Sequence, residues 1–172
     1  MKKTATSKDH QFRNFLSLNN STKYLLIMPE DHRPHTASYL ILQKQDEVLL
    51  MKRKDTGFKD GFYSLVSGHV DKGENFREAM VREAKEEVGI NVDKEDLETA
   101  NVIHRDSDQR TYVDIFFIAD EWEGEPENLE PGKHGEISWF KKKNLPENTI
   151  DYVKYAIKDS GNGTNYNEWG WE

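Results

Sequence analysis

Residues 68–90 combine a glycine-rich turn with a helix whose apolar side carries carboxylates. The expected helix, 75–88, gathers its apolar side chains on one arc at about 100° per residue. These side chains are Phe76, Ala79, Met80, Ala84 and Val88. Glu83 and Glu87 fall within that arc and Glu86 lies at its flank, whereas a surface helix usually turns its carboxylates to the opposite side. We therefore expect three carboxylates to converge on one partly buried spot.

Carboxylates in this position predict a site for a hard divalent cation. Glu83 and Glu87 are like charges at i, i+4, which repel by roughly a few tenths of a kcal/mol when exposed and by more when desolvated. A cation that accepts oxygen ligands, Mg²⁺ or Mn²⁺, would offset this repulsion. Gly68 supports the interpretation, because a glycine lets the backbone approach closely and offer its carbonyl as a further ligand. The alternative is a solvated acidic patch toward which Arg82 and Lys85 turn.

A fixed pattern runs through the same segment: G-x5-E-x7-R-E-U-x-E-E-x-G-U, in which U is a bulky aliphatic residue. Its positions are filled by Gly68, Glu74, Arg82, Glu83, Glu86, Glu87, Gly89 and Ile90. Seven fixed positions match by chance on the order of 10⁻⁹ per start site, at roughly 5–7% usage for each residue type. The pattern resembles the signature of the Nudix hydrolases, and the resemblance extends loosely over residues 36–158. It departs at Ala84, which is small for an aliphatic position, and at 65–67, where Leu-Val-Ser stands in place of Leu-Pro-Gly.

The resemblance implies both a fold and a reaction. The fold is α/β (α+β), an α/β/α sandwich around a mixed central sheet. The reaction is the hydrolysis of a nucleoside diphosphate linked to another moiety. Metal ions are needed for this reaction because they neutralise the polyanionic diphosphate, orient it and lower the pKa of bound water.

The resemblance also implies roles for the residues of the motif. Mg²⁺, or Mn²⁺ in its place, would be bound by Glu83, Glu86 and Glu87, with the Gly68 carbonyl as a further ligand. One of these glutamates, with Glu83 as the first choice, would take the proton of the attacking water. The structural residues of the motif are Glu74, Arg82 and Gly89. The first two are implied to form an ion pair that holds the loop against the helix.

Glu136 is a further catalytic candidate outside the helix. It ends an acidic stretch, 120–136, that holds seven acids and one base together with Pro126 and Pro131, so the stretch is predicted to be a loop. In Nudix relatives a Glu in a loop at about this place often supplies an extra metal ligand or the general base. One more solvated carboxylate is an equally compatible interpretation.

Six residues outside the metal set are candidates for substrate binding: Lys52, Arg53, Phe62, Tyr63, His69 and Trp139. The two basic residues end a strand that leads to the site and the histidine adjoins Gly68, so all three are candidate phosphate contacts. The aromatic residues are candidates for stacking on a base. Solvated strand ends and core packing are the respective alternatives.

Marks outside the motif narrow the substrate by elimination. The ADP-ribose hydrolases of the family show a Pro a short distance after the motif, where this chain has Arg105. The diadenosine polyphosphate hydrolases show a Tyr near there, and Tyr112 comes slightly too late. The isopentenyl diphosphate isomerase relatives use a Cys, and this chain has none. The leading hypothesis is a (deoxy)nucleoside triphosphate pyrophosphatase that releases NMP and pyrophosphate. An NDP-sugar or dinucleotide hydrolase and a non-catalytic nucleotide-binding regulator are the alternatives.

Apolar patterning around the motif predicts strands on both sides of the central helix and a second helix near the C-terminus. The expected strands are 38–43, 47–52, 62–66, 97–105, 111–119 and 136–140, and the closing helix is 148–158. Three parts follow: an N-terminal extension at 1–34, a Nudix hydrolase domain at 35–160 and a C-terminal tail at 161–172. We expect an irregular tail whose two Trp side chains are available to dock.

Composition argues against several other classes of function. The chain has 24 Lys+Arg against 32 Asp+Glu, a net charge of −8, which does not suit a protein that coats nucleic acid. The absence of Cys excludes disulfides, thiolate nucleophiles and Cys-ligated zinc. No apolar run approaches the ~20 residues that span a bilayer, and no apolar run of a signal peptide follows the N-terminal lysines. We expect a cytoplasmic monomer or homodimer whose partner is a small nucleotide, not a nucleic-acid polymer or a membrane.

Overall fold

Eight strands and two helices make up the described part of the chain, residues 33–107 and 110–171 of a computed structural model. The strands are β1 His35–Lys44, β2 Glu47–Arg53, β3 Tyr63–Ser64, β4 Val66–His69, β5 Glu98–Ser107, β6 Arg110–Ala119, β7 His134–Lys141 and β8 Asn165–Trp169. The helices are α3 Phe76–Val88 and α4 Asp151–Asp159. The predicted N-terminal extension, 1–34, lies outside the described residues apart from its last two.

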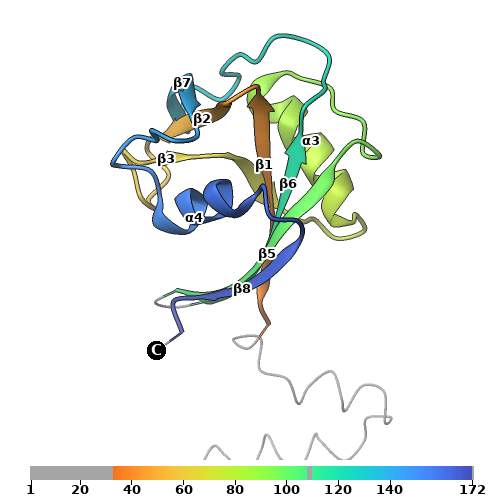
Figure 1. Ribbon diagram of the computed structural model, residues 1–172, viewed down its shortest axis with the longest axis vertical. Coiled ribbons are helices and arrows are strands. Elements are labelled where there is room, and N and C mark those ends of the chain that lie inside the picture. The colour runs from red at the N-terminus through yellow and green to blue at the C-terminus, as the bar shows by residue number, and fades with distance from the viewer. Residues whose placement is uncertain (1–32, 108–109, 172) are drawn as a thin grey trace, which may run out of the picture. The chain divides into compact units, whose positions relative to one another are not determined.

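All of these strands belong to one mixed sheet. Its order is β3-β2-β1-β6-β5-β8, with β4 paired to β1 and β7 paired to β2. The pairs β1–β6 and β5–β8 are parallel and the other pairs are antiparallel. Helix α3 covers one face and α4 the other (Figure 1). This arrangement confirms the predicted α/β/α sandwich with a mixed central sheet.

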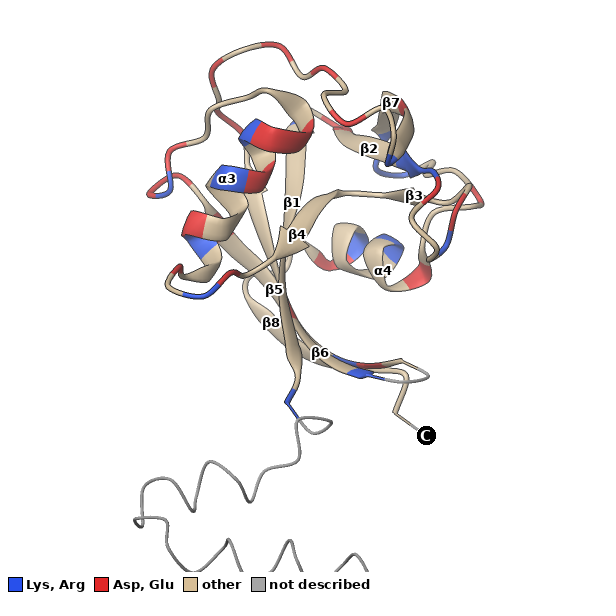
Figure 2. Ribbon diagram, turned by 180° about the vertical axis from the view of Figure 1, so that it is seen from behind, with Lys and Arg blue, Asp and Glu red and all other residues tan. Residues whose placement is uncertain are grey.

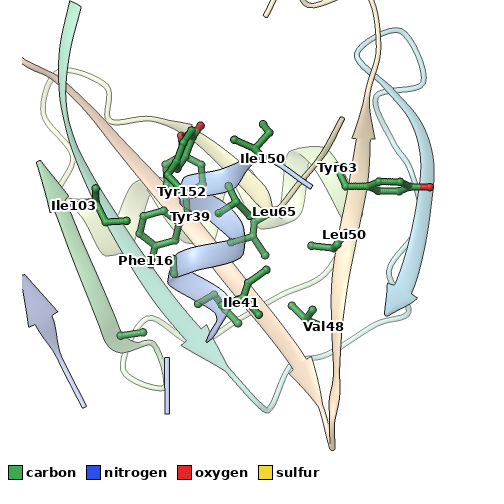
Figure 3. Close-up of a cluster of buried hydrophobic side chains, with 14 of the residues drawn as sticks. Tyr39, Ile41, Val48, Leu50, Tyr63, Leu65, Ile103, Phe116, Ile150 and Tyr152 are labelled. Atoms are coloured by element: carbon green, nitrogen blue, oxygen red, sulfur yellow. Dashed lines mark hydrogen bonds between the residues drawn. The ribbon is translucent and has the colours of Figure 1, made fainter. Parts of the chain in front are cut away.

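Two apolar clusters fill the space between the sheet and its helices. The cluster under α4 includes Tyr39, Ile41, Val48, Leu50, Phe116, Val153, Ala156 and Ile157 (Figure 3). The cluster under α3 includes Leu40, Leu42, Leu49, Met51, Met80, Ala84 and Val88. Alternate residues of β1 and β2 enter opposite clusters because successive side chains of a strand point to opposite faces. Both faces of these strands are therefore buried, which explains their continuous apolar sequence.

Helix α3 is capped at both ends, and the two caps fix where it begins and ends. The Asn75 side chain accepts hydrogen bonds from the Arg77 and Glu78 backbone N–H groups, and Glu78 accepts from the Asn75 N–H in return. This capping box satisfies helix donors that otherwise lack partners. At the C-terminus Gly89 adopts φ 74°, a left-handed conformation that glycine enters without strain. The prediction of a helix over 75–88 is confirmed.

The predicted irregular tail is wrong for residues 165–169. They form β8, which pairs in parallel with the edge of β5. Trp169 packs against the cluster under α4, and Trp171 Nε1 donates to the His104 carbonyl at 2.9 Å. The segment NYNEW shows no apolar alternation because backbone hydrogen bonds to β5, rather than a buried face, hold most of it in place. The closing helix also begins three residues later than predicted, at Asp151.

Residues 120–133 of the acidic stretch form the connection between β6 and β7, as predicted, whereas its last residues belong to β7. Figure 2 shows the acidic residues, coloured red, spread along this connection. Its backbone is tied to the C-terminal end of α3. The Glu127 N–H donates to the Val88 carbonyl and the Leu129 N–H to the Glu87 carbonyl, both at 3.0 Å. These bonds bring the start of β7 beside the motif helix.

Candidate active site

A cavity of about 600 Å³ opens where the motif meets the sheet. Its motif side includes Gly68, His69, Arg82, Glu83 and Glu87. Its sheet side includes Ala37, Tyr39, Arg105 and Tyr112, with Tyr152 from α4. The end of β2 with the loop after it, and the start of β7 with the residue before it, also contribute to the lining, through Arg53, Phe58, Lys133 and His134. The cavity therefore joins the motif glutamates to residues that lie far from them in sequence.

The Glu83 carboxylate lies directly against Gly68. A Cβ at position 68 would overlap the Glu83 carboxyl group, so any side chain there would displace the carboxylate. Burial raises the pKa of Glu83, the hydrogen bond from Arg82 lowers it, and the neighbouring charge of Glu87 raises it again. The net direction is upward, with burial as the largest cause.

Arg82 links the carboxylates of the motif. Its guanidinium contacts Glu74 at 3.1 Å, Glu83 at 2.7 Å and Glu86 at 3.2 Å. Nη2 also donates to the His69 carbonyl at 3.0 Å, which ties the loop before the helix to the helix itself. The structure thus contains the Glu74–Arg82 ion pair. Arg82 also turns toward Glu83 and Glu86.

Glu87 is buried, and both of its carboxylate oxygens have a partner. Oε2 accepts from the Ser67 N–H at 2.9 Å, and Oε1 lies 3.0 Å from His134 Nε2. Glu130 Oε2 is 3.9 Å from the same ring nitrogen. His134 Nδ1 is buried without a hydrogen-bond partner among the described residues. An imidazole at this place fixes the orientation of Glu87.

The donor set fits a hard divalent cation. Carboxylate oxygens of Glu83 and Glu87 lie on the same side of the cavity as the Gly68 backbone, and carboxylate and carbonyl oxygens are the ligands of Mg²⁺ and Mn²⁺. Within 33–107 and 110–171, ligand atoms that all lie within 4.8 Å of one another belong to Glu87, Glu130 and His134. A cation that also used Glu83 would compete with Arg82 for its carboxylate.

Comparison with known proteins places the chain in a family. A family model described as the NUDIX domain matches residues 31–158. The chain belongs to the Nudix hydrolase family. Nudix hydrolases act on small nucleotide substrates and generally use a divalent metal. Within the residues that the structure describes, no helix has both the length and the apolar character to cross a bilayer.

Named Nudix relatives fall into more than one substrate group. The chain is 38% identical over 120 residues to an ADP-ribose pyrophosphatase of Methanocaldococcus jannaschii, an overlap of 69% of this chain and 68% of the relative. It is 28% identical over 98 residues to an 8-oxo-dGTP diphosphatase of Proteus vulgaris, covering 57% of this chain and 86% of the relative. The crystal structure of a MutT NUDIX hydrolase from Burkholderia pseudomallei matches with a TM-score of 0.69 at 25% identity, covering 74% of this chain and 98% of that one. The comparisons establish a Nudix hydrolase and leave its substrate open.

The cavity brings together some of the predicted substrate-binding residues and not others. Arg53 and His69 line it. Burial lowers the pKa of His69, and nearby His35 lowers it further. The other four candidates, Lys52, Phe62, Tyr63 and Trp139, are not among its lining residues. Substrate contacts for these four stay predictions.

Those four side chains have other surroundings in the fold. Tyr63 belongs to the cluster under α4, and Lys52 Nζ lies over its ring at 5.8 Å. Trp139 stacks on Trp122, with ring centroids 5.9 Å apart. Phe62 is partly exposed and lies under Lys59 Nζ at 5.2 Å.

Glu136 lies on β7, outside the lining of the cavity. Its Oε2 accepts from the Tyr63 hydroxyl at 2.8 Å and its Oε1 from the Ser138 hydroxyl at 3.0 Å. These two hydrogen bonds lower the pKa of Glu136. The structure therefore does not bring it together with Glu83 and Glu87, and its catalytic role stays a prediction.

The sequence did not reveal the roles of two residues that line the cavity, His134 and Arg105. His134 gave no signal because its partner Glu87 is 47 positions away. Arg105 was noted only as the residue in place of a Pro. In the structure its Nε donates to Asp114 Oδ2 at 2.6 Å, and its guanidinium carbon lies 4.1 Å from the Tyr112 ring centroid and 4.4 Å from that of Tyr152. The available signal was the presence of the charged residues Arg105 and Asp114 within two strands that are otherwise rich in apolar residues.

Proposed function

We propose that this chain catalyses the Mg²⁺-dependent hydrolysis of a diphosphate bond in a nucleoside diphosphate-linked substrate. The leading substrate is a (deoxy)nucleoside triphosphate, which would give NMP and pyrophosphate. The observation that carries the proposal is the approach of the Glu83 carboxylate to Gly68 beside buried Glu87, at one end of a cavity large enough for a nucleotide. Pockets of about 300–1,000 Å³ are typical for small ligands.

The residues of the motif divide the chemistry among them. Glu83, Glu86, Glu87 and the Gly68 carbonyl would hold Mg²⁺, with Mn²⁺ as a substitute. When bound, the metal supplies charge neutralisation of the diphosphate and a lower pKa for the attacking water. Glu83 is the proposed general base, because its carboxylate lies against Gly68 in the lining of the cavity.

The side chains around these glutamates set their positions. Ser67 N–H and His134 Nε2 each hold one oxygen of Glu87, which leaves the carboxylate little freedom to rotate. Partners of this kind commonly fix the ligands of a metal. Glu74 and Gly89 act on structure, the first by its contact with Arg82 and the second by ending the helix.

Arg53 is the proposed phosphate contact. Its side chain donates to the Phe58 carbonyl at 2.8 Å and to Thr56 Oγ1 at 3.0 Å. It forms no ion pair at 4.0 Å or less with any described carboxylate, so its charge is available to a substrate anion. The other cations of the motif side, Arg82 and Lys133, are each paired with glutamates.

The second candidate function is hydrolysis of a nucleoside diphosphate derivative such as ADP-ribose. It is favoured by the 38% identity to an ADP-ribose pyrophosphatase, whereas the similarity to an 8-oxo-dGTP diphosphatase favours the triphosphate. The lack of a Pro after the motif, at Arg105, keeps the triphosphate first. A non-catalytic regulator is disfavoured because all motif glutamates are present.

A substrate panel with product identification tests the proposal. Nucleoside triphosphates, ADP-ribose, NDP-sugars and dinucleotides are incubated with the protein and Mg²⁺, and products are separated by chromatography. NMP with pyrophosphate supports the leading function, and AMP with ribose 5-phosphate supports the second. Absence of turnover on every member, in Mg²⁺ and in Mn²⁺, would refute both.

A further inference from the structure

Arg105 is held rigidly at the sheet side of the cavity, away from the motif. Tyr112 and Tyr152, from β6 and α4, place their rings against its guanidinium, and Asp114 takes its Nε–H. Stacking and a fixed ion pair leave the terminal nitrogens, Nη1 and Nη2, as the remaining donors. Within 33–107 and 110–171 these nitrogens make no hydrogen bond, and they are not among the buried unpartnered atoms. Because Arg105 lines the cavity, they face a ligand or solvent there.

Charge indicates what kind of ligand these donors accept. The Arg105–Asp114 pair is neutral overall, and Asp114 is fully buried beside the guanidinium. A phosphate at Arg105 would bring a second anion next to that carboxylate in a region of low dielectric, which is unfavourable. Arg53, which has no such carboxylate partner, suits a phosphate better. Arg105 therefore suits a neutral acceptor group.

Shape narrows the acceptor further. Two N–H groups on adjacent nitrogens of a guanidinium match two neighbouring acceptor atoms in one plane. The O6 and N7 atoms of a 6-oxopurine form such a pair, whereas adenine presents an amino donor at position 6. Ala37, in register with Asp114 on β1, lines the cavity with only a methyl group, which leaves room above this part of the sheet for a flat base.

The carboxylate of Asp114, which is paired with Arg105, lacks one hydrogen-bond partner in the described part of the chain. Asp114 Oδ1 is buried and has no hydrogen-bond partner among the described residues. An unsatisfied buried acceptor is rare in folded proteins and calls for an explanation. Asp114 itself does not line the cavity, but it is paired with Arg105, which does.

We propose that Arg105 is the specificity-determining residue of this enzyme and selects nucleotides with a 6-oxopurine base through O6 and N7. The inference rests on the proposed function, since it adds the base to the diphosphate substrate already described. The diphosphate lies at Arg53 and the motif glutamates, and the base lies at Arg105. Phe58 and Tyr39 also line the cavity.

The test compares substrates that differ only in the base. GTP and ITP both present O6 and N7, 7-deaza-GTP lacks the N7 acceptor, and ATP lacks O6. We expect kcat/KM for GTP and ITP to exceed that for ATP by about 10- to 100-fold and that for 7-deaza-GTP by about 10-fold. This arm uses the unaltered protein, so it does not depend on the folding of a variant.

Arg105→Lys supplies the second arm, because lysine keeps the charge beside Asp114 and loses the paired donors. We expect the ratio of kcat/KM for GTP and ITP to kcat/KM for ATP to fall toward one in the variant. Arg77→Lys is the matched control. Arg77 also lies over an aromatic ring, Phe117 at 5.5 Å, but does not line the cavity.

Each other outcome has one meaning. Equal kcat/KM values for the four nucleotides, or an equal fall for all four in Arg105→Lys, would overturn the assignment of Arg105 while the hydrolase function stands. If none of the four triphosphates is hydrolysed, the triphosphate as leading substrate fails instead. Titration of the same proteins with GDP and ADP then decides Arg105 alone: tighter binding of GDP that Arg105→Lys abolishes supports it, and equal binding overturns it.

Discussion

The two ends of the cavity differ in their balance of charge. At the motif end the Arg82 guanidinium contacts three carboxylates, those of Glu74, Glu83 and Glu86, and buried Glu87 lies nearby on the same helix. At the sheet end one guanidinium meets one carboxylate, and both are buried. The first end has an excess of negative charge that a bound cation can relieve, whereas the second is already balanced. The difference teaches that a site needs unbalanced charge for a metal and balanced, directional groups for a neutral base.

The largest expected effect tests the unbalanced end. Glu87→Gln should lower kcat by about 10²–10⁴, since a metal ligand is lost. The Gln side chain can keep a contact with Ser67 N–H, and removing one of several like charges relieves repulsion, so the melting temperature without metal should hold or rise. Steady-state kinetics in saturating Mg²⁺ and thermal unfolding measure the two quantities.

Glu78→Gln is the control for this change, because Glu78 lies on the same helix but is exposed and serves in the capping box, where Gln also works. It should keep both activity and stability. Near-full turnover of Glu87→Gln in saturating Mg²⁺ would contradict the metal assignment.

A substitution at the balanced end should lower the stability of the protein. Asp114→Ala leaves the Arg105 guanidinium buried without its carboxylate, and breaking such a pair costs about 3–5 kcal/mol. For a chain of this size that corresponds to a fall in melting temperature of roughly 10 °C. Urea unfolding gives the free energy directly, with exposed Asp96→Ala as the control. A loss below about 1 kcal/mol would show that the pair is not a structural unit.

His134 connects the sheet to the unbalanced end, so its removal should have an intermediate effect. His134→Ala frees the Glu87 carboxylate and should raise the Mg²⁺ concentration for half-maximal activity by about 10- to 100-fold. His134→Gln offers an N–H donor again and should recover part of the loss. The rise in melting temperature on addition of Mg²⁺ gives an independent measure of metal binding. An unchanged Mg²⁺ dependence in both variants would remove His134 from the site.

Glu136 should give the smallest effect, because it belongs to neither end of the cavity. Glu136→Gln and Glu127→Gln are compared at low and high salt. We expect mild losses of similar size that shrink at high salt, as for solvated charges that steer a ligand. A fall in kcat of about 10²–10⁴ for Glu136→Gln alone, at either salt concentration, would restore Glu136 as a ligand or base.

The same contrast explains how much the sequence alone could predict. The motif end was predictable because α3 is a local structure: spacings of three and four residues put Glu83, Glu86 and Glu87 on one side whatever the rest of the chain does. The two ends of the helix were predictable as well, since Asn is a common N-cap residue and Gly a common C-cap residue.

The sheet end depends on register, which no local pattern reveals. Arg105 faces Tyr112 only because β5 and β6 pair as they do, and Tyr152 reaches it from a helix 47 positions along the chain. His134 meets Glu87 through backbone bonds that link the acidic loop to α3. The strand β8 was missed for a related reason, since its sequence is polar and its stability comes from the neighbouring edge of β5.

The attachment of the acidic loop to α3 also separates two kinds of evolutionary freedom. The bonds from Glu127 and Leu129 to the last turn of the helix use backbone N–H groups, so they satisfy helix carbonyls without regard to side-chain identity. Substitutions in the loop should therefore be tolerated widely, and its many acids can change while the attachment persists. An insertion or deletion is different, because it would shift the segment that delivers His134 to Glu87. Among natural relatives, this loop should vary in composition and keep its length.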